Sequence, residues 1–408
     1  METFFFPKEN IVFFINGPIV ESLIMKIVIF QPVLKQYRVP LFNELQHLLS
    51  RQGHQLRVVC GSPPPQEQSK GDNILIGEGC CLVENSLWLF NGKLHFLRHS
   101  LSHILWADFV ITEQANKHFH NYLLIIFHVL GLKKFGYWGH GQNRQGNPDS
   151  WRERMKKLLS KKCDWWFAYT EGVARYIGGL GYPKSQITAL NNSIDTSYFQ
   201  QLLADVTAND IEEFKFRFQI DASARIGLFC GSLYGEKRLD FLLDAAVLIH
   251  NKNPGFVLLV VGSGDDRSLV EKYSNRYSYI KYLGPLFNKE KALAFKSAEI
   301  FLCPGLVGLA ILDAFVAGLP LFTCNIPYHS PEIEYLQSGY NGLMTNAVPE
   351  EYAGEIVNTL DDLEKLVFLR NNAISGAKFF SIENMAQNFF NGIEMFFEAQ
   401  VNFKLGVD

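Results

Sequence analysis

The sequence predicts an α/β protein built from two Rossmann-like, doubly wound domains that face each other across a cleft. The chain has 408 residues, more than a single hydrophobic core usually serves. Short apolar runs alternate with longer amphipathic stretches in both halves, a pattern typical of parallel sheets covered by helices. Residues 198–218 are polar and acidic and interrupt this alternation. We expect them to form the inter-domain region.

The first alternation defines an expected domain over residues 25–205. Its strands are expected at residues 26–30, 55–60, 109–112, 135–138, 165–170 and 186–190. Helices are expected between them, for example over residues 39–49 and 151–159. Residues 1–24 are an expected N-terminal extension, because Met25 followed by an apolar strand looks like a natural start. The alternative is a short segment that touches a membrane.

The second alternation is cleaner and defines an expected domain over residues 220–381. Its strands are expected at residues 226–230, 256–261, 279–283, 300–303 and 321–324, and its helices at 238–250, 289–297 and 309–317. Gly318 and Pro320 supply the stop signal of the last of these helices. Residues 382–399 carry phenylalanines at helical spacing, so residues 382–408 are expected to form a final helix.

Composition excludes several classes of protein. Hydrophobic residues at 48% and charged residues at 19% describe a folded chain, and a net charge of −3 gives no general attraction to nucleic acid. The seven cysteines are scattered and odd in number, which favours a reducing compartment. No CxxC pair occurs, and we expect no metal site; we expect His118 and His120 on a helix surface.

Glycines and cations follow the strands of the second half, where doubly wound domains bind ligands. Gly231 and Ser232 follow one strand, and Lys237 and Arg238 open the next helix, as in an anion site. The alternative is a solvated helix start. Residues 304–308 form a second glycine loop, which is either a ligand-facing backbone or a simple tight turn.

Asp313 follows that loop among apolar neighbours, so its carboxylate needs a partner. A ribose diol is one candidate, and Lys237 or Arg238 is another.

These motifs resemble the family 4 glycosyltransferases of the GT-B fold, from Met25 to near the end of the chain. The resemblance implies that Lys237 binds the diphosphate of a nucleotide-sugar donor. Ser232 stands where the family usually has arginine, and Arg238 is expected to compensate. Gly262 is similar to the strand-end glycines of the family, and Gly284 to a segment that meets the nucleobase.

The family signature places acidic residues at the positions of Gly305 and Asp313. Asp313 keeps the acid expected to hold the ribose, whereas Gly305 offers no side chain. We interpret this departure as the mark of a subgroup with a differently bound sugar. The resemblance implies that the backbone amides of Gly308 and Leu309 reach the phosphate, and that the final helix crosses back to the first domain.

The first half resembles the acceptor-binding domain of that family. Tyr37 and Arg38 follow the first strand, and a Tyr-Arg-Val-Pro subgroup exists. Arg38 is expected either to meet a phosphate or to lie on the surface at a helix start. Glu113 ends a strand and is expected to bind an acceptor hydroxyl. The resemblance implies that His140, flanked by glycines, contacts the donor sugar; the alternative is a locally bonded loop histidine.

The expected activity is transfer of a sugar from a UDP- or GDP-sugar to a glycan or lipid-linked glycan, with retention, in surface polysaccharide or glycoconjugate synthesis. His140, Lys237 and Arg238 are the expected catalytic residues. The nucleotide sugar is a substrate, and no cofactor or obligatory metal is expected. Two alternatives stay open, a degenerate subunit that binds nucleotide sugar without turnover and a sugar-nucleotide 2-epimerase.

Residues 151–166 combine lysines and arginines with tryptophans at both ends, as in segments that bind anionic membrane surfaces. The alternative is an ordinary solvated amphipathic helix. The expected location is the cytoplasm, at the cytoplasmic face of the inner membrane if this segment binds lipid.

Overall fold

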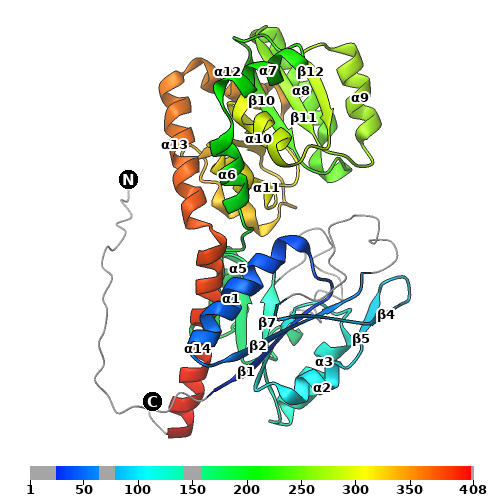
Figure 1. The fold of residues 1–408 in the computed structure, drawn as a ribbon, viewed down its shortest axis with the longest axis vertical. Coiled ribbons are helices and arrows are strands. Elements are labelled where there is room, and N and C mark those ends of the chain that lie inside the picture. The colour runs from blue at the N-terminus through cyan, green and yellow to red at the C-terminus, as the bar shows by residue number, and fades with distance from the viewer. Residues whose placement is uncertain (1–23, 64–78, 142–157, 406–408) are drawn as a thin grey trace.

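The structure, a computed structural model, describes residues 24–63, 79–141 and 158–405. Figure 1 shows two α/β domains, one above the other, with the last helix running along the first domain. Each domain contains one parallel sheet with helices on both faces. The predicted fold class is confirmed.

The first sheet has seven strands in the order β3-β2-β1-β6-β7-β8-β9, and all its neighbouring strands are parallel. Its strands are β1 (Lys26–Gln31), β2 (Gln55–Gly61), β3 (Cys81–Glu84), β6 (Phe109–Glu113), β7 (Lys134–Gly139), β8 (Trp165–Ala168) and β9 (Ile187–Ala189). The order reverses between β1 and β6, so the loops after these two strands flank a switch point, where open sheets bind ligands.

Two layers of helices bury this sheet. Its helices are η1 (Gln36–Arg38), α1 (Val39–Arg51), α2 (Ser100–Trp106), α3 (Phe119–Val129), α5 (Glu171–Gly179) and η3 (Lys184–Gln186). One core joins α1 and the last helix to the sheet, and a second core joins α2, α3 and α5 to the opposite face. The expected helix over residues 151–159 lies mostly outside the described residues.

An antiparallel hairpin was not predicted. It consists of β4 (Ser86–Leu89) and β5 (Leu94–Leu97), and it lies beside α2 and α3 in Figure 1. Asn91 and Gly92, between two apolar runs, are a strong hairpin signal that the reading of the sequence missed.

The second sheet has six parallel strands in the order β12-β11-β10-β13-β14-β15. Its strands are β10 (Arg225–Cys230), β11 (Phe256–Val261), β12 (Ile280–Gly284), β13 (Ile300–Leu302), β14 (Leu321–Cys324) and β15 (Gly342–Thr345). Its helices are η4 (Gly235–Lys237), α8 (Leu239–Lys252), α9 (Arg267–Arg276), α10 (Asn288–Ser297), α11 (Ala310–Val316), η5 (Pro331–Tyr335), α12 (Pro349–Asp361) and α13 (Leu363–Phe379).

Residues 198–218, expected to connect the domains, are mostly helical. They form α6 (Ser197–Asp205) and α7 (Ala208–Arg217), and Phe199 and Phe214 join the core of the second domain. Residues 197–205 therefore pack with the second domain, although the first was expected to extend to residue 205. A few buried aromatic side chains anchor these helices despite their polar composition.

The last helix, α14 (Ile382–Leu405), starts at the junction between the domains and packs on the first one. Phe396 stacks on Phe109 with ring centroids 3.9 Å apart, and Phe389 stacks on Phe167 at 4.6 Å. The expected crossover helix is confirmed.

Candidate functional site

The loops after β10 and β11 touch backbone to backbone at the carboxyl edge of the second sheet. Gly262 has φ +142°, and a Cβ atom there would overlap the carbonyl oxygen of Gly231. Gly264 has φ +150°, and a Cβ atom there would overlap the carbonyl oxygen of Leu233. Only glycine fits such close backbone contacts. The glycines therefore bring these two loops together at one edge.

The loop after β13 also packs on the backbone of η4. A Cβ atom at Gly305 would overlap the backbone of Glu236 and Lys237, and the N–H of Leu306 donates to the carbonyl oxygen of Glu236 at 2.7 Å. Gly305, which replaces the family acid, therefore has a structural reason. Any side chain here would separate the two loops that flank the expected phosphate site.

His329 fixes the same loop from the other side. The N–H of Val307 donates to His329 Nδ1 at 3.1 Å, and His329 Nε2 donates to the carbonyl oxygen of Cys324 at 2.8 Å. These partners assign the neutral tautomer with the proton on Nε2. Gly308 lies beside Ser330, and Gly284, with φ +69°, ends β12 at the same edge.

The two expected cations differ in position. Lys237 is buried, and its Nζ donates to the carbonyl oxygen of Leu306 at 2.5 Å, which leaves two N–H groups for another acceptor. Arg238 has φ 53°, precedes α8, and holds its guanidinium 4.5 Å from the ring centroid of Phe241. Lys237 thus points into the contact between the loops, while Arg238 lies against α8. Ser232 is exposed.

Asp313 has a partner that the sequence reasoning missed. Its Oδ2 lies 2.7 Å from Nζ of Lys291, a residue of α10, and both side chains are partly buried. Both charges act on the thiol of Cys230, the last residue of β10, whose pKa burial raises to about 12. The Lys291–Asp313 pair therefore lies at the carboxyl end of β10. The spacing of residues along α10 could not predict this contact, because the contact joins α10 to a separate helix, α11.

In the first domain, the three expected acceptor-side residues line one pocket of about 190 Å³. Tyr37 and Arg38 come from the loop after β1, and Glu113 ends β6. The remaining lining residues are Gln31, Pro32, Val33, Lys35, Trp88, Lys117 and Tyr169. The pocket thus combines aromatic walls with charges of both signs, a lining suited to a polar ligand with an apolar face.

Arg38 is buried, so the expected surface position at a helix start is wrong. Its Nη1 donates to Oδ1 of Asn192 at 2.8 Å, and its guanidinium lies 5.0 Å from the Trp138 ring centroid. Asn192 in turn donates to the carboxylate of Glu332 in the second domain. Arg38 is therefore the inner end of a polar chain that joins the domains.

A histidine chain lies behind Glu113. His118 Nε2 lies 3.6 Å from Glu113 Oε2, and His118 Nδ1 lies 3.0 Å from His95 Nδ1. Burial would raise the pKa of Glu113, but the interaction with His118 outweighs it and lowers that pKa to about 2. The carboxylate is therefore ionised and can accept hydrogen bonds from the hydroxyls of a ligand.

The expectation that His118 and His120 lie on a helix surface is wrong, because both are buried. His120 Nε2 lies 3.1 Å from Oγ1 of Thr112, whose own proton goes to Asn121. Burial lowers the pKa of His95 to about 3 and that of His120 well below its usual value. The spacing of these histidines could not reveal burial, because the hairpin that covers them was not predicted.

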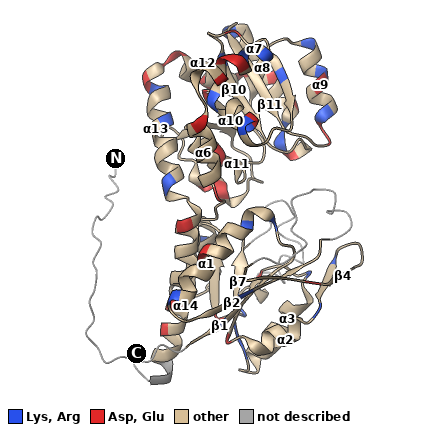
Figure 2. Cartoon of the chain, in the orientation of Figure 1, with Lys and Arg blue, Asp and Glu red and all other residues tan. Residues whose placement is uncertain are grey.

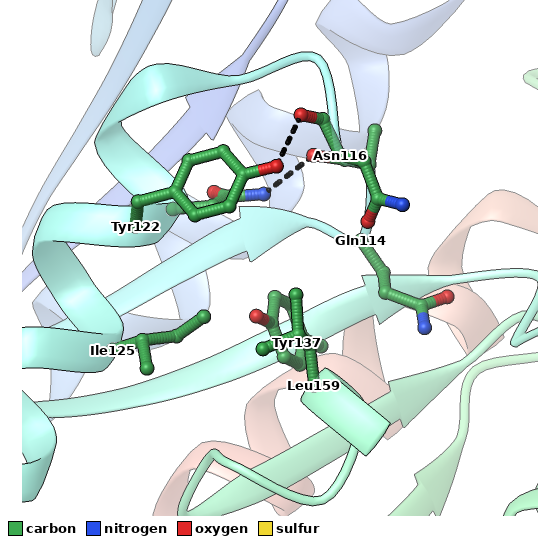
Figure 3. A pocket seen from close by; sticks show the side chains of 8 residues that line it. Gln114, Asn116, Tyr122, Ile125, Tyr137 and Leu159 are labelled. Atoms are coloured by element: carbon green, nitrogen blue, oxygen red, sulfur yellow. Dashed lines mark hydrogen bonds between the residues drawn. The ribbon is translucent and has the colours of Figure 1, made fainter. Parts of the chain in front are cut away.

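His140 follows β7 and is exposed, as expected for a histidine flanked by glycines. Its ring centroid lies 4.1 Å from that of Tyr169, which lines the same pocket as Glu113. His140 therefore adjoins the acceptor-side pocket. A further cavity, next to α3 and lined by Tyr122, Tyr137 and Leu159, holds only about 10 Å³ (Figure 3). It has space for about one water molecule and not for a substrate.

Two doubly wound domains that face each other define the GT-B class of enzymes. Comparison of the sequence with known protein families agrees with this class. The family "Glycosyltransferase Family 4" matches residues 42–198, and "Glycosyl transferases group 1" matches residues 224–362. The chain belongs to the family 4 glycosyltransferases.

Curated relatives match parts of the chain. It is 23% identical to the alpha-monoglucosyldiacylglycerol synthase of Acholeplasma laidlawii over 209 residues, which cover 50% of this chain and 51% of the relative. It is 30% identical to the phosphatidyl-myo-inositol mannosyltransferase of Mycobacterium tuberculosis H37Rv over 118 residues, 27% of this chain and 31% of the relative. The matches thus span about half the length of these relatives or less.

Solved structures share the fold over nearly the whole chain. Anabaena HepE in complex with UDP has a TM-score of 0.65 at 14% identity, covering 91% of this chain and 100% of its own. The pneumococcal O-GlcNAc transferase GtfA in complex with UDP and GlcNAc has a TM-score of 0.60 at 12% identity, covering 92% and 99%. Identities this low support the fold alone.

Proposed function

We propose that this chain transfers a sugar, with retention, from a UDP- or GDP-sugar to a hydroxyl of a glycan or lipid-linked glycan. The observation that carries the proposal is the Lys291–Asp313 pair beside the glycine loops after β10, β11 and β13. In this proposal Asp313 accepts hydrogen bonds from the ribose, and Lys237 donates to the diphosphate. UDP is the first nucleotide to test, because Anabaena HepE and pneumococcal GtfA carry it.

The acceptor is proposed to occupy the pocket of the first domain. Glu113, held ionised beside His118, accepts a hydrogen bond from an acceptor hydroxyl, and Trp88 and Tyr37 offer ring faces to a sugar. His140 is proposed to contact the donor sugar from its place beside Tyr169. Arg38 lines this pocket and is held in place by its hydrogen bond to Asn192.

The proposed reaction forms a bond between the acceptor oxygen and the anomeric carbon and breaks the bond from that carbon to the diphosphate. The acceptor proton passes to the departing phosphate on the same face of the sugar. Lys237 and nearby backbone amides stabilise the charge on the leaving group, which is electrostatic catalysis by fixed groups. Such a step needs no covalent intermediate.

Calorimetric titration of the full chain with UDP, GDP and their sugar conjugates tests the donor site. Asp313→Asn is expected to weaken binding of the preferred nucleotide about tenfold, which corresponds to about 1.4 kcal/mol. The matched control is Asp210→Asn, because Asp210 forms the same kind of pair, at 2.7 Å, with Lys289 of the same helix α10. Equal weakening by both variants, or no binding by the wild type, would contradict the proposal.

Turnover separates the two alternatives. A transferase releases the nucleotide in proportion to acceptor, a 2-epimerase converts the donor without acceptor, and a degenerate subunit binds the donor without consuming it. Gly305 and Ser232, which depart from the family pattern, are the best support for a degenerate subunit. The close contact of Gly305 with Lys237 supplies a structural reason for glycine there, so the proposal favours an active enzyme. The cytoplasmic location stays a prediction, and no helix among the described residues is long and apolar enough to cross a membrane.

A further inference from the structure

Helix α3 turns an apolar stripe toward solvent. Phe119, Tyr122, Ile126 and Val129 follow one another at spacings of three and four residues, and their exposed fractions are 37%, 39%, 53% and 68%. The helix contains no lysine, arginine, aspartate or glutamate, and Figure 2 shows it without a charged residue. A surface helix of a soluble protein normally turns polar residues outward, so this stripe indicates a missing partner.

The stripe continues onto α2. Nζ of Lys133, which follows α3, donates to the carbonyl oxygens of Leu105 and Ala107 at 3.0 and 2.5 Å. These bonds hold the end of α3 next to the end of α2, where Leu105 and Leu130 are both more than 60% exposed. We call the set Leu105, Phe119, Tyr122, Ile126, Val129 and Leu130 the apolar face.

The hairpin links the apolar face to the acceptor-side pocket. Phe96 stacks on Phe119 with ring centroids 4.4 Å apart, and Leu87 is the cross-strand neighbour of Phe96. Trp88, the next residue, lines the pocket and pairs across the hairpin with His95. Because side chains alternate along a strand, one face of the hairpin extends the apolar face and the other walls the pocket.

Basic residues border the apolar face. Lys134 is the first residue of β7, the strand after α3, and Lys161 and Lys162 follow Leu159, which lines the small cavity of Figure 3 together with Tyr122. Helices α2 and α3 contain no acidic residue, and the nearby Asp164 is already paired with Lys134 and His128. An aliphatic and aromatic surface with a cationic border suits a bilayer with anionic headgroups.

We propose that the apolar face docks this chain on an anionic lipid surface, with the acceptor-side pocket held beside the bilayer. This deepens the proposed function, on which it rests for the idea that the acceptor is lipid-linked. It also relocates the expected membrane contact. Trp166, at one end of residues 151–166, is fully buried in β8, and much of that segment lies outside the described residues.

The test is co-sedimentation of the full chain with phosphatidylcholine vesicles, with and without phosphatidylglycerol. Wild type is expected to bind the anionic vesicles, less so as salt rises. Ile126→Gln with Val129→Gln is expected to weaken this binding at least about tenfold, because polar amides replace apolar side chains at the lipid contact. The matched control, Leu363→Gln with Val367→Gln, changes similarly exposed residues of α13 and is expected to bind like wild type.

The preference of the chain for anionic over neutral vesicles is tested separately. Lys161→Glu with Lys162→Glu is expected to reduce binding to anionic vesicles and to leave the weak binding to neutral vesicles unchanged. Should the double variant of α3 fail to fold, Leu105→Gln, a single change on an exposed side chain of α2, takes its place. Calorimetry with UDP should give the wild-type affinity for every variant, because the donor loops lie in the other domain.

Three results would overturn the proposal. One is equal vesicle binding by wild type and the Ile126 and Val129 variant. Another is no vesicle binding by a monomeric wild type. The third is a dimer in solution that the same variant dissociates, since a second copy of the chain would then cover the apolar face. Loss of UDP binding with intact vesicle binding would contradict the proposed function and leave this surface unaffected.

Discussion

Gly305 and Lys237 are in backbone contact, and that contact joins the two loops that flank the proposed phosphate site. A Cβ atom on Gly305 would overlap the Lys237 carbonyl. The position is therefore closed to the acidic side chain that the family signature carries there.

Gly305→Ala and Gly305→Glu are both expected to destabilise the second domain and to weaken nucleotide binding. Forcing extra atoms into a packed contact costs about 1–3 kcal/mol. Urea unfolding and calorimetry with UDP measure the two effects. Gly235→Ala is the control, since a Cβ atom at Gly235, in the same turn as Lys237, would meet nothing within 4 Å. Tighter UDP binding by Gly305→Glu would show that the loops separate easily and that this argument is wrong.

Arg38→Lys is expected to destabilise the chain although the charge is kept. The Arg38 guanidinium donates a hydrogen bond to Asn192 and at the same time lies over the ring of Trp138. A lysine ammonium is not planar and cannot make both interactions in this geometry. Loss of a buried charged hydrogen bond suggests about 1–3 kcal/mol in urea unfolding. Arg51→Lys, at an exposed position in α1, is the control. Equal midpoints for both variants would mean that Arg38 contributes only its charge.

The sequence predicted the strands well because short apolar runs and strand-end glycines are local signals. It also placed Glu113 at the end of a strand and Asp313 in the helix after a glycine loop, where the structure has them. The partners were beyond its reach. Lys291 meets Asp313 from another helix, and Trp88 reaches the acceptor-side pocket only because a hairpin turns it inward. Contacts between elements that are distant in sequence produce no periodic pattern of residues from which they could be predicted.

Acid should destabilise the first domain through its buried histidines. Burial lowers the pKa of His95 to about 3, whereas the unfolded chain takes up this proton near pH 6.5. The unfolded state therefore binds more protons between these values, and the free energy of unfolding falls as the pH falls from about 6.5 toward 3, by at most about 1.4 kcal/mol per pH unit.

Urea unfolding at about pH 7 and about pH 5 measures this slope. His95→Asn is expected to reduce it without abolishing it, because burial also lowers the pKa of His120. His47→Asn, at an exposed position in α1, serves as the control. A slope unchanged by His95→Asn would mean that other groups dominate the response to acid.

The domains also meet where Glu334 of η5 caps helix α5. The N–H of Gly172 donates to Glu334 Oε2 at 2.6 Å, and a Cβ atom at Gly172 would overlap that carboxylate. Gly172→Ala is therefore expected to displace Glu334, at a cost of about 1 kcal/mol for the lost cap. The domains should then separate more readily, which small-angle scattering would record as a larger radius of gyration.

The effect should change sign when Glu334 is absent. In a Glu334→Ala background the three atoms nearest to the new methyl group, all from the Glu334 carboxylate, are gone, and alanine is a better helix former than glycine by up to about 1 kcal/mol. Gly172→Ala should then stabilise the chain. Gly179→Ala, later in the same helix with no atom within 4 Å of the added Cβ, controls for helix propensity alone. If Gly172→Ala destabilises both backgrounds equally, the carboxylate is not what requires glycine at this junction.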